Sequence, residues 1–333
     1  MAIRVLHMGL GPIGLAVVKQ VASRKGFKSV GAVDIDPAKI GKDLGEVAGL
    51  DKKLKVAVSD KIAATIKATQ PDVVALCTSS SLKSIVPQLE ALMKAKVPVV
   101  STTEELSYPF YSNKKLAKQI DAMARKAGVA IVGTGVNPGF IMDALPITLT
   151  GVCERVEKIH IDRIQDARSR RLPFQKKIGS GLTPEEFQQK VEAGTVRHVG
   201  LTESIAMIGD AMGWKLDKIT DEIQPKIATK PVSSQFLTVK KGQVCGIIQD
   251  GVGYRDGEAI ITLHMEAYLG APESFDAVRI EGSPALYSKV LGGVHGDVAT
   301  ASITVNSMPK VIDAPAGLHT MRSLPIPSFH GGK

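Results

Sequence analysis

A glycine-rich turn between two apolar segments constrains this chain more than any other feature. Residues 3–8 are typical of a short buried strand, residues 9–14 read Gly-Leu-Gly-Pro-Ile-Gly, and apolar residues then recur at helical spacing from Leu15 to Ser23. A second apolar run, residues 30–33, ends in Asp34. The order strand, G-x-G-x-x-G turn, helix, strand and acid predicts a unit that binds a dinucleotide. The alternative is a glycine-rich turn that closes an ordinary β-α unit.

Each residue of this turn has a physical reason to be there. Gly9 permits the tight turn, Gly11 lets the backbone approach a pyrophosphate, and Gly14 lets the helix pack closely on the strand. Pro12 and Ile13 complete the turn before the helix, so the phosphates are expected beside them at the N-terminus of this helix, where the helix dipole favours negative charge. We therefore interpret these five residues as cofactor-binding.

Asp34 bears on which dinucleotide is bound. A carboxylate at the end of the second strand can accept hydrogen bonds from the ribose hydroxyls of the adenosine, and it would repel a 2′-phosphate. No Arg follows Asp34 directly, although Lys39 and Lys42 lie nearby in the sequence. The sequence therefore favours NAD(H) and leaves NADP(H) possible.

Strand and helix signals alternate as far as residue 140. Apolar runs at residues 55–58, 72–77, 97–101 and 129–132 are interspersed with helical patterns, which include residues 82–94 and 113–127. Continuous apolar runs are typical of parallel strands that are buried on both faces. The alternation predicts an α/β dinucleotide-binding domain over residues 1–140, with a Rossmann-type doubly wound parallel sheet.

Polar and turn-forming residues follow three of these strands, at the edge of the sheet where a ligand is expected. The residues expected to contact the cofactor there are Thr78, Ser79, Ser80, Thr102, Asn137 and Pro138. Two alternatives stay open. Ser80 or Ser81 can simply cap the following helix, and residues 137–139 can be a loop that starts the next one.

Glu104 is the main candidate for the chemistry. A carboxylate at the end of a strand, beside a nicotinamide, can hold or deprotonate an amine, or stabilise an iminium cation as hydride arrives. The competing interpretation is that Glu104 and Glu105 are solvated acids in the first turn of a helix. If the chain is extended there, Glu105 points away from Glu104.

The pattern changes after residue 140, and at 333 residues two domains are expected. Strand signals over residues 156–162, 235–239, 244–249 and 259–267 predict an α+β domain with a largely antiparallel sheet over residues 141–297. Lys241-Gly242 and Asp256-Gly257 are the turn signals.

Helices complete the expected second domain. They are predicted over residues 142–149, from Thr183, and around 202–213, whereas residues 167–182 read as basic and irregular. Thr183 and Glu186 are expected to form a capping box. Helical spacing near the end predicts that a segment of about residues 298–333 returns to the first domain.

Four residues are candidates for contact with a substrate: Phe140, Arg168, His264 and His295. Arg168, with Arg170 and Arg171, can grip a carboxylate in bidentate fashion, and the alternative is a solvated basic loop. His295 lies among glycines that would let a ligand approach closely. The alternative for both histidines is an ordinary surface position or a hydrogen-bonded place in the core.

Charge and cysteine usage exclude several classes of protein. The net charge is +9, but the lysines are dispersed and form no block of like charges, so no nucleic-acid partner is expected. The three cysteines lie far apart and show no metal-ligand spacing, which predicts no metal site and a reducing cytoplasmic compartment. No apolar run is long enough to span a membrane. The sequence opens directly into its first expected strand, so no signal peptide is expected.

Three segments resemble the 2,4-diaminopentanoate dehydrogenase group, which includes the native amine dehydrogenases and has a dihydrodipicolinate-reductase-like N-terminal domain. These segments are residues 9–14, 101–109 (Ser-Thr-Thr-Glu-Glu-Leu-Ser-Tyr-Pro) and 133–140 (Gly-Thr-Gly-Val-Asn-Pro-Gly-Phe). The resemblance continues through residues 170–175 and 314–318 and so covers nearly the whole chain.

The resemblance implies reductive amination of a ketone with ammonia, the reverse oxidative deamination, and Glu104 as the catalytic carboxylate. It also implies a homodimer built largely from the second domain, which would bind the substrate. The sequence has no adjacent histidines, whereas true dihydrodipicolinate reductases carry such a pair. The alternatives are an imine or carbonyl reductase that does not need ammonia, and a non-catalytic protein that senses NAD.

Overall fold

The computed structural model describes residues 2–331, which divide into two compact units. Unit 1 runs from the N-terminus to Phe140 and resumes at His295, and unit 2 comprises Ile141–Val294. Within the described residues, no helix combines the length and the apolar character that a membrane span requires.

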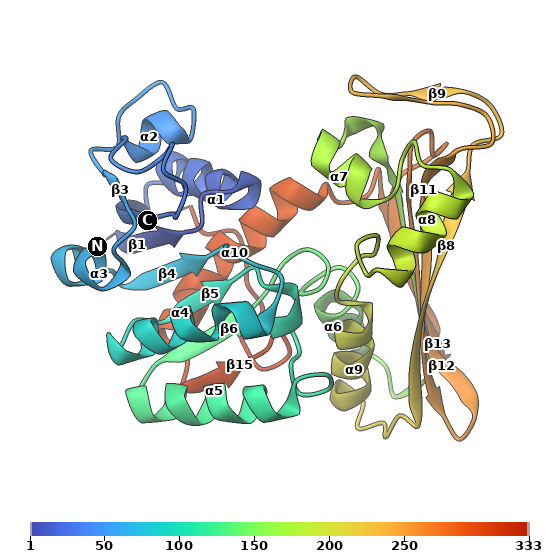
Figure 1. The fold of residues 1–333 in the computed structure, drawn as a ribbon. Helices are drawn as coiled ribbons and strands as arrows, with labels where there is room; N and C mark the ends of the chain where they lie inside the picture. Colours follow the sequence, from blue (N-terminus) through green and yellow to red (C-terminus); the bar gives the residue numbers. More distant parts are fainter. Residues whose placement is uncertain (1, 332–333) are drawn as a thin grey trace. The chain divides into compact units, whose positions relative to one another are not determined.

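Unit 1 is built on a parallel sheet of seven strands (Figure 1). The strands are β1 (Ile3–Met8), β2 (Phe27–Val33), β3 (Val58–Ser59), β4 (Val73–Leu76), β5 (Val99–Ser101), β6 (Ala130–Gly133) and β15 (Gly317–His319). Their order is β15-β6-β5-β4-β1-β2-β3, and each neighbouring pair is parallel. This arrangement confirms the doubly wound sheet.

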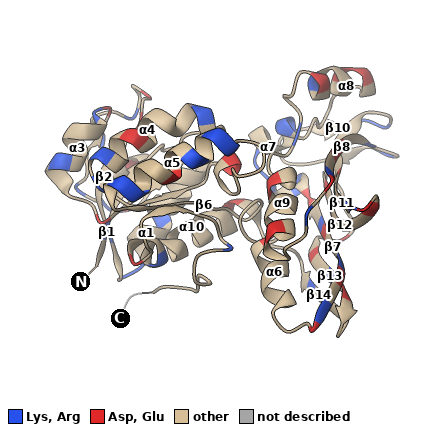
Figure 2. Ribbon diagram, turned by 90° about the horizontal axis from the view of Figure 1, so that it is seen from below, with Lys and Arg blue, Asp and Glu red and all other residues tan. Residues whose placement is uncertain are grey.

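Helices cover both faces of this sheet. They are α1 (Pro12–Ser23), α2 (Leu44–Val47), α3 (Ile62–Thr69), α4 (Leu82–Lys94), the 3-10 helix η1 (Glu104–Leu106), α5 (Lys114–Ala127) and α10 (Gly296–Ile312). α3, α4 and α5 lie on one face, and α1 and α10 lie together on the other (Figures 1 and 2). The end of the chain therefore returns to the first unit, through α10 and through β15 at the edge of the sheet.

Charged residues of both signs are interspersed along α4 and α5 (Figure 2). The amphipathic pattern of α5 buries Ala117, Ile120 and Ala124, and Gly128 ends the helix in the left-handed conformation with φ 75°. The lysines of this helix thus lie on its solvated side, as the sequence pattern indicates.

The expected strand at residues 55–58 is wrong at its start, although Ala57 forms a single antiparallel bridge with Asp43. Val58 begins the short strand β3, while Lys55 has a positive φ of 58°. The carboxylate of Asp43 accepts the N–H groups of Leu54 (2.9 Å) and Val56 (3.2 Å), so these groups are not available to a strand ladder. The Asp43 side chain thus holds the start of this segment, whereas the backbones of Leu44 and Lys42 pair with Val56 (2.8 Å) and Val58 (3.0 Å).

Unit 2 contains a six-stranded sheet with the order β14-β13-β7-β12-β11-β8. The strands are β7 (Arg155–Asp166), β8 (Lys218–Ile227), β11 (Val244–Arg255), β12 (Glu258–Tyr268), β13 (Phe275–Ser283) and β14 (Leu286–Leu291). Only the pair β7–β12 is parallel within this sheet. Asp256 and Gly257 close the β11–β12 hairpin with φ of 52° and 77°, which confirms the predicted turn.

Short helices and a separate hairpin complete unit 2. They are α6 (Ala144–Thr150), the 3-10 helix η2 (Ala167–Ser169), α7 (Leu172–Lys177), α8 (Pro184–Glu192), α9 (Leu201–Ala211), and the strands β9 (Val232–Ser233) and β10 (Thr238–Val239). The capping box is confirmed, because Thr183 and Glu186 each accept the other's backbone N–H. α9 packs on β8, β11 and β12 (Figure 1), and an added Cβ at Gly251 would meet Ile205 at 2.8 Å.

The sequence predicts an irregular segment at residues 167–182, and this prediction is wrong. The segment contains η2 and α7. Gln175 is fully buried, and its side-chain amide donates to the carbonyl oxygens of Ala167 (3.0 Å) and Arg170 (2.8 Å). Ser234 in turn donates to Gln175 Oε1 (2.8 Å). One buried amide thus organises a basic segment that has little apolar periodicity of its own.

Candidate active site

The three glycines of the first turn meet different surroundings. A Cβ at Gly9, which has φ 84°, would lie 2.5 Å from the carbonyl oxygen of Cys77, and a Cβ at Gly14 would lie 1.9 Å from the carbonyl oxygen of Gly9. Both positions are closed to any side chain by the protein itself. A Cβ at Gly11 would meet no atom within 4 Å, so nothing in the fold requires glycine there. The open space at Gly11 lies at the N-terminus of α1.

Asp34 ties the end of β2 to this turn. It is 9% exposed, its Oδ2 accepts the N–H of Leu10 (2.6 Å), and its Oδ1 accepts the N–H of Asp36 (2.8 Å). Lys39 Nζ lies 3.5 Å from Asp34 Oδ2 and 3.2 Å from Asp36 Oδ2. The carboxylate is therefore fixed beside the glycine turn and partly balanced by one lysine.

The loop after β4 carries hydroxyl groups, but none of them caps the following helix α4. Ser81 occupies the N-cap of α4 but makes no side-chain cap hydrogen bond, and Ser79 Oγ accepts the N–H of Ser81 (3.1 Å). The N–H of Leu82 instead donates to Glu105 Oε2 (2.7 Å). The alternative in which Ser80 or Ser81 caps the helix is therefore wrong. Thr78 and Ser80 are exposed.

Glu104 begins the 3-10 helix η1 directly after β5, and it is half-buried. Its carbonyl oxygen accepts from the backbone N–H (3.1 Å) and the hydroxyl (2.8 Å) of Ser107. The chain is not extended here, so the expectation that Glu105 points away for that reason is wrong. Instead, Glu105 is turned onto the first residue of α4. Thr102 hydrogen-bonds the thiol of Cys77, whose pKa is raised to about 11 by burial.

The segment after β6 forms a close-packed loop. Asn137 is 7% exposed, the Asn137–Pro138 peptide bond is cis, and Val136 N–H donates to Thr300 Oγ1 of α10 (3.3 Å). Gly139 has φ 123°, and a Cβ there would lie 2.4 Å from the backbone nitrogen of Gly135. The ends of β1, β4, β5 and β6, which carry these segments, lie along one edge of the parallel sheet, because carboxyl ends of parallel strands share an edge.

The substrate candidates do not form one cluster within either unit. Phe140 ends unit 1, and His295 is an exposed N-cap of α10 without a side-chain cap hydrogen bond. Arg168 has a half-exposed side chain that pairs with Asp166 (2.6 Å). His264 lies in β12, where its ring nitrogens face Asp250 Oδ1 (2.7 Å) and Glu266 Oε1 (3.2 Å).

Electrostatics distinguish the histidines of unit 2. Burial acts to lower the pKa of His264, but its hydrogen bonds with the two carboxylates outweigh it and raise the pKa. Burial lowers the pKa of His198 to about 3, and the nearby cations add to this effect. These cations are Lys177, Arg163, Arg170 and Arg197. His198 is thus a neutral group inside a cationic cluster.

Arg163 is the residue of this cluster that sequence reasoning missed. It is 3% exposed, is paired with the buried Asp276, and donates to the carbonyl oxygen of Val294 (3.0 Å). The signal was available, because Arg163 follows Ile159 and Ile161 at a spacing of two on the buried face of β7. A charged residue at an apolar position of an alternating strand marks a built polar site.

Comparisons with known proteins cover the whole chain. Residues 140–332 match the 2,4-diaminopentanoate dehydrogenase C-terminal domain, and residues 3–134 match the N-terminus of dihydrodipicolinate reductase. A 2,4-diaminopentanoate dehydrogenase from Acetoanaerobium sticklandii is 35% identical over 98% of this chain and 94% of its own length. The chain belongs to the 2,4-diaminopentanoate dehydrogenase family.

Other relatives agree with this placement. An amine dehydrogenase from Streptomyces virginiae is 24% identical over 96% of this chain and 95% of its own. The solved structure of an amine dehydrogenase from Mycobacterium smegmatis superimposes with a TM-score of 0.87 and 26% identity, over 99% of this chain and 98% of that one. A dihydrodipicolinate reductase from Paenisporosarcina shares the fold, with a TM-score of 0.56 and 14% identity over 97% and 99% of the two chains. This family member is an NAD(P)-dependent oxidoreductase that acts on amines.

The residues of unit 1 fit a nicotinamide dinucleotide. The first turn of α1 has no side-chain cap, so its backbone N–H groups are available to an anion. The open space at Gly11 adjoins these groups, and the Asp34 carboxylate is held at the same turn. Gly11, Pro12, Ile13 and Asp34 would hold the adenosine half of the cofactor.

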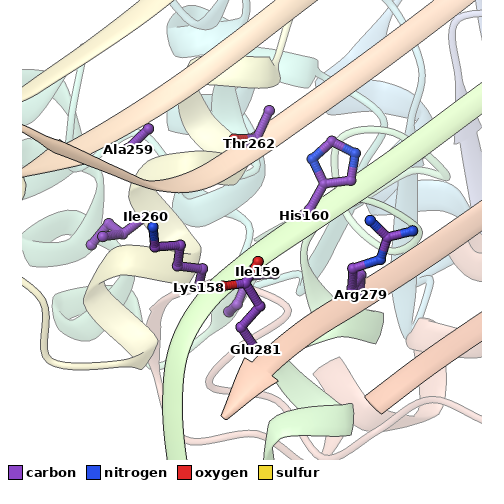
Figure 3. Close-up of a pocket in the computed structure, with 8 residues that line it drawn as sticks. All are labelled: Lys158, Ile159, His160, Ala259, Ile260, Thr262, Arg279 and Glu281. Carbon is purple, nitrogen blue, oxygen red and sulfur yellow. The ribbon is translucent and has the colours of Figure 1, made fainter. Parts of the chain in front are cut away.

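Unit 2 also has a shallow pocket of about 180 Å³ that contains none of the predicted site residues (Figure 3). It lies on the face of the sheet opposite α9, where His160 of β7 is paired in register with Arg279 of β13. Lys158 and Glu281 lie beside them, and charges of both signs therefore line this pocket.

Proposed function

We propose that this chain catalyses NAD-dependent reductive amination of a small ketone with ammonia, and the reverse oxidative deamination, with Glu104 as the catalytic carboxylate. The observation that carries the proposal is the place of Glu104. It begins a short turn at the carboxyl end of a central strand, beside the loop that holds Ser79 and Ser80. Ligands of doubly wound sheets bind at this edge.

The chemistry asked of Glu104 is electrostatic. Ketone and ammonia condense through a carbinolamine, which takes up one proton and loses water to give an iminium ion. The carbon of this ion needs a hydride, and its nitrogen carries the positive charge. A carboxylate that hydrogen-bonds this nitrogen stabilises the charge most strongly where water is excluded. In the reverse direction the same carboxylate can accept a proton from the amine. A bound nicotinamide supplies or accepts the hydride.

We propose NAD(H) as the preferred cofactor, with NADP(H) as a weaker one. Asp34 would accept the ribose hydroxyls and repel a 2′-phosphate, and Lys39 softens the repulsion because it lies beside Asp34. Asp34→Asn should lower the ratio of kcat/KM for NADH over NADPH about tenfold, equal to about 1.4 kcal/mol. Asp36→Asn is the matched control, and an equal change in both variants would contradict the role of Asp34.

We propose that the substrate carries a carboxylate, as 2,4-diaminopentanoate in the relative's name does. The cations around His198 support this, because Lys177, Arg163, Arg170 and Arg197 all lie near one neutral imidazole. The comparison of 4-oxopentanoate with 2-pentanone tests it, since only the first has the carboxylate. Equal kcat/KM for both ketones would argue against the acidic substrate.

The first experiment measures NADH oxidation with a panel of ketones, with and without ammonium at alkaline pH. Oxidation that requires ammonium supports the proposal, whereas oxidation without it indicates an imine or carbonyl reductase. Glu104→Gln should lose most turnover and still bind NADH, and the exposed Glu90→Gln of α4 is the control. NADH binding without turnover of any ketone would leave the NAD-sensing alternative.

We also propose a cytoplasmic homodimer formed through unit 2. The face of the six-stranded sheet opposite α9 carries the exposed side chains of Tyr287 and Leu291, which lie in register with Arg279 and Phe275 of β13. A second copy could cover this face. Light scattering after size-exclusion chromatography tests it, and a monomer at micromolar concentration would contradict it.

A further inference from the structure

Glu105 joins the turn that carries Glu104 to the loop in front of α4. Its backbone N–H donates to the carbonyl oxygen of Ser80 (3.3 Å), and its Oε2 accepts the N–H of Leu82 (2.7 Å). Leu82 is the first residue of α4, so its N–H has no acceptor inside the helix. The carboxylate also carries the charge that a helix N-terminus favours. A residue beside the proposed catalytic carboxylate thus caps a helix that starts more than 20 residues earlier in the chain.

The neighbouring hydroxyl groups hold the same turn. Thr103 Oγ1 donates to the carbonyl oxygen of Ser79 (2.7 Å), and Ser101 Oγ lies 3.0 Å from Thr103 Oγ1. Ser101 and Thr103 are fully buried, so these contacts are shielded from water. The turn is therefore fastened to the 79–82 loop by side chains on both sides of Glu104.

The opposite flank of the turn lies against β6. A Cβ at Gly133 would lie 2.4 Å from the carbonyl carbon of Leu106 and 2.7 Å from the backbone nitrogen of Ser107. Glycine is needed there because the backbone of η1 approaches so closely. The 3-10 turn is consequently held between the 79–82 loop and the end of β6.

The Glu104 carboxylate depends entirely on this backbone. Within the part of the chain that the structure describes, no side chain or backbone group pairs with it, by hydrogen bond or by ion pair. Its position therefore follows from the conformation of η1, which Glu105 fastens.

We propose that Glu105 is a positioning residue for Glu104, which locks the catalytic turn to the loop expected to contact the cofactor. The proposal rests on the function proposed above. It predicts that catalysis depends on the acceptor oxygen of Glu105 more than on its negative charge. It also predicts that loss of the Glu105 side chain lowers the rate of the chemical step rather than the affinity for the cofactor. Thr103 still holds Ser79 when the Glu105 side chain is removed.

The test compares Glu105→Ala with Glu105→Gln, and uses Glu90→Ala as the control for loss of an exposed acid from α4. Glu105→Ala should lower kcat for ammonia-dependent NADH oxidation by about 10- to 100-fold, the usual effect of misplacing a reacting group by about 1 Å. The Kd for NADH should stay close to the parent value, because Thr103 still holds Ser79. Glu105→Gln keeps an acceptor for the N–H of Leu82 and should restore most of kcat.

A double variant separates positioning from mere capping. If Glu105 acts through Glu104, the variant Glu104→Gln with Glu105→Ala turns over as slowly as Glu104→Gln alone, because the two effects are not additive. The proposal is overturned if Glu105→Ala has the same kcat as Glu90→Ala. It is also overturned if Glu105→Ala loses NADH affinity and unfolding temperature in proportion to its loss of kcat. Additive losses in the double variant would also overturn it. A fully active Glu104→Gln would remove the proposed function as well, whereas a slow Glu104→Gln beside a fast Glu105→Ala would remove only the role of Glu105.

Discussion

At the scale of single residues, the glycines of the first turn separate the needs of the fold from those of a ligand. A Cβ added at Gly9 or Gly14 would lie within 2.5 Å of a backbone atom of the protein, so no other residue fits there. A Cβ added at Gly11 would have no atom within 4 Å. A motif read from sequence treats the three alike, because the spacing alone does not show which atoms approach each position. The space around each glycine explains Gly9 and Gly14 by packing and leaves Gly11 to the proposed cofactor.

This distinction predicts opposite behaviour for two alanine variants. Gly14→Ala should lower the free energy of unfolding by roughly 1–3 kcal/mol, because its Cβ overlaps the Gly9 carbonyl. Gly11→Ala should keep the parent stability, since its φ of −70° suits alanine, and should weaken NADH binding about tenfold or more. Thermal unfolding and NADH fluorescence titration measure the two effects. A stable Gly14→Ala, or a Gly11→Ala that binds NADH normally, would contradict this assignment.

At the scale of elements, local signals predicted what local chemistry controls. The βαβ unit at the N-terminus, α4, α5, the capping box of α8 and the β11–β12 turn all follow from residues close in sequence. The strands β8, β13 and β15 do not, because they carry many charged residues or are very short and form by pairing with distant strands. The edge strand β14 pairs only with β13, its neighbour in sequence, and this local hairpin was missed. The edge that carries Glu104 was predictable from strand ends, whereas the capping of α4 by Glu105 depends on a contact between distant residues.

The buried pair Arg163–Asp276 shows how an element can depend on a distant partner. Asp276→Asn leaves the charge of Arg163 buried without its counterion and should destabilise unit 2 by about 3–5 kcal/mol. Glu258→Gln removes the exposed ion pair with Lys158 and should cost under about 1 kcal/mol. Urea unfolding followed by the fluorescence of Trp214, which lies in unit 2, measures both. Equal losses of unfolding free energy in the two variants would show that burial does not make the Arg163–Asp276 pair more important for stability than an exposed pair.

At the scale of the whole molecule, each unit contains a histidine that burial keeps neutral. His7 in β1 is 1% exposed, and its Nε2 lies 2.9 Å from Ser29 Oγ, while His198 lies in unit 2. Burial lowers the pKa of His7 from 6.5 to about 3, and burial together with nearby cations lowers that of His198 to about 3. Both units therefore oppose protonation of a histidine.

The pH dependence of stability follows from these depressed pKa values. Between pH 6.5 and about 3 the unfolded chain binds a proton at His7 that the folded chain does not, so the contribution is full above pH 6.5 and is lost as the pH falls. The loss is roughly 1.4 kcal/mol per pH unit. His7→Gln should flatten the acid limb of the unfolding curve by one proton, whereas the exposed His295→Gln should leave it unchanged. The measurement is the slope of unfolding free energy against pH between 6 and 4, and an unchanged slope in His7→Gln would contradict the prediction.

Because the chain divides into two compact units, we expect a bound cofactor to stabilise mainly the unit that binds it. The glycine turn, Asp34 and the strand ends proposed to hold NADH all belong to unit 1. A ligand that binds only folded unit 1 stabilises it by about 2.7 kcal/mol at 100 times its Kd. Hydrogen exchange with and without NADH should therefore slow most in β1, β4 and α1, and least in β8, β13 and β14. Equal protection of both sheets would show that the units unfold as one cooperative body, and protection of unit 2 alone would remove the proposed cofactor site.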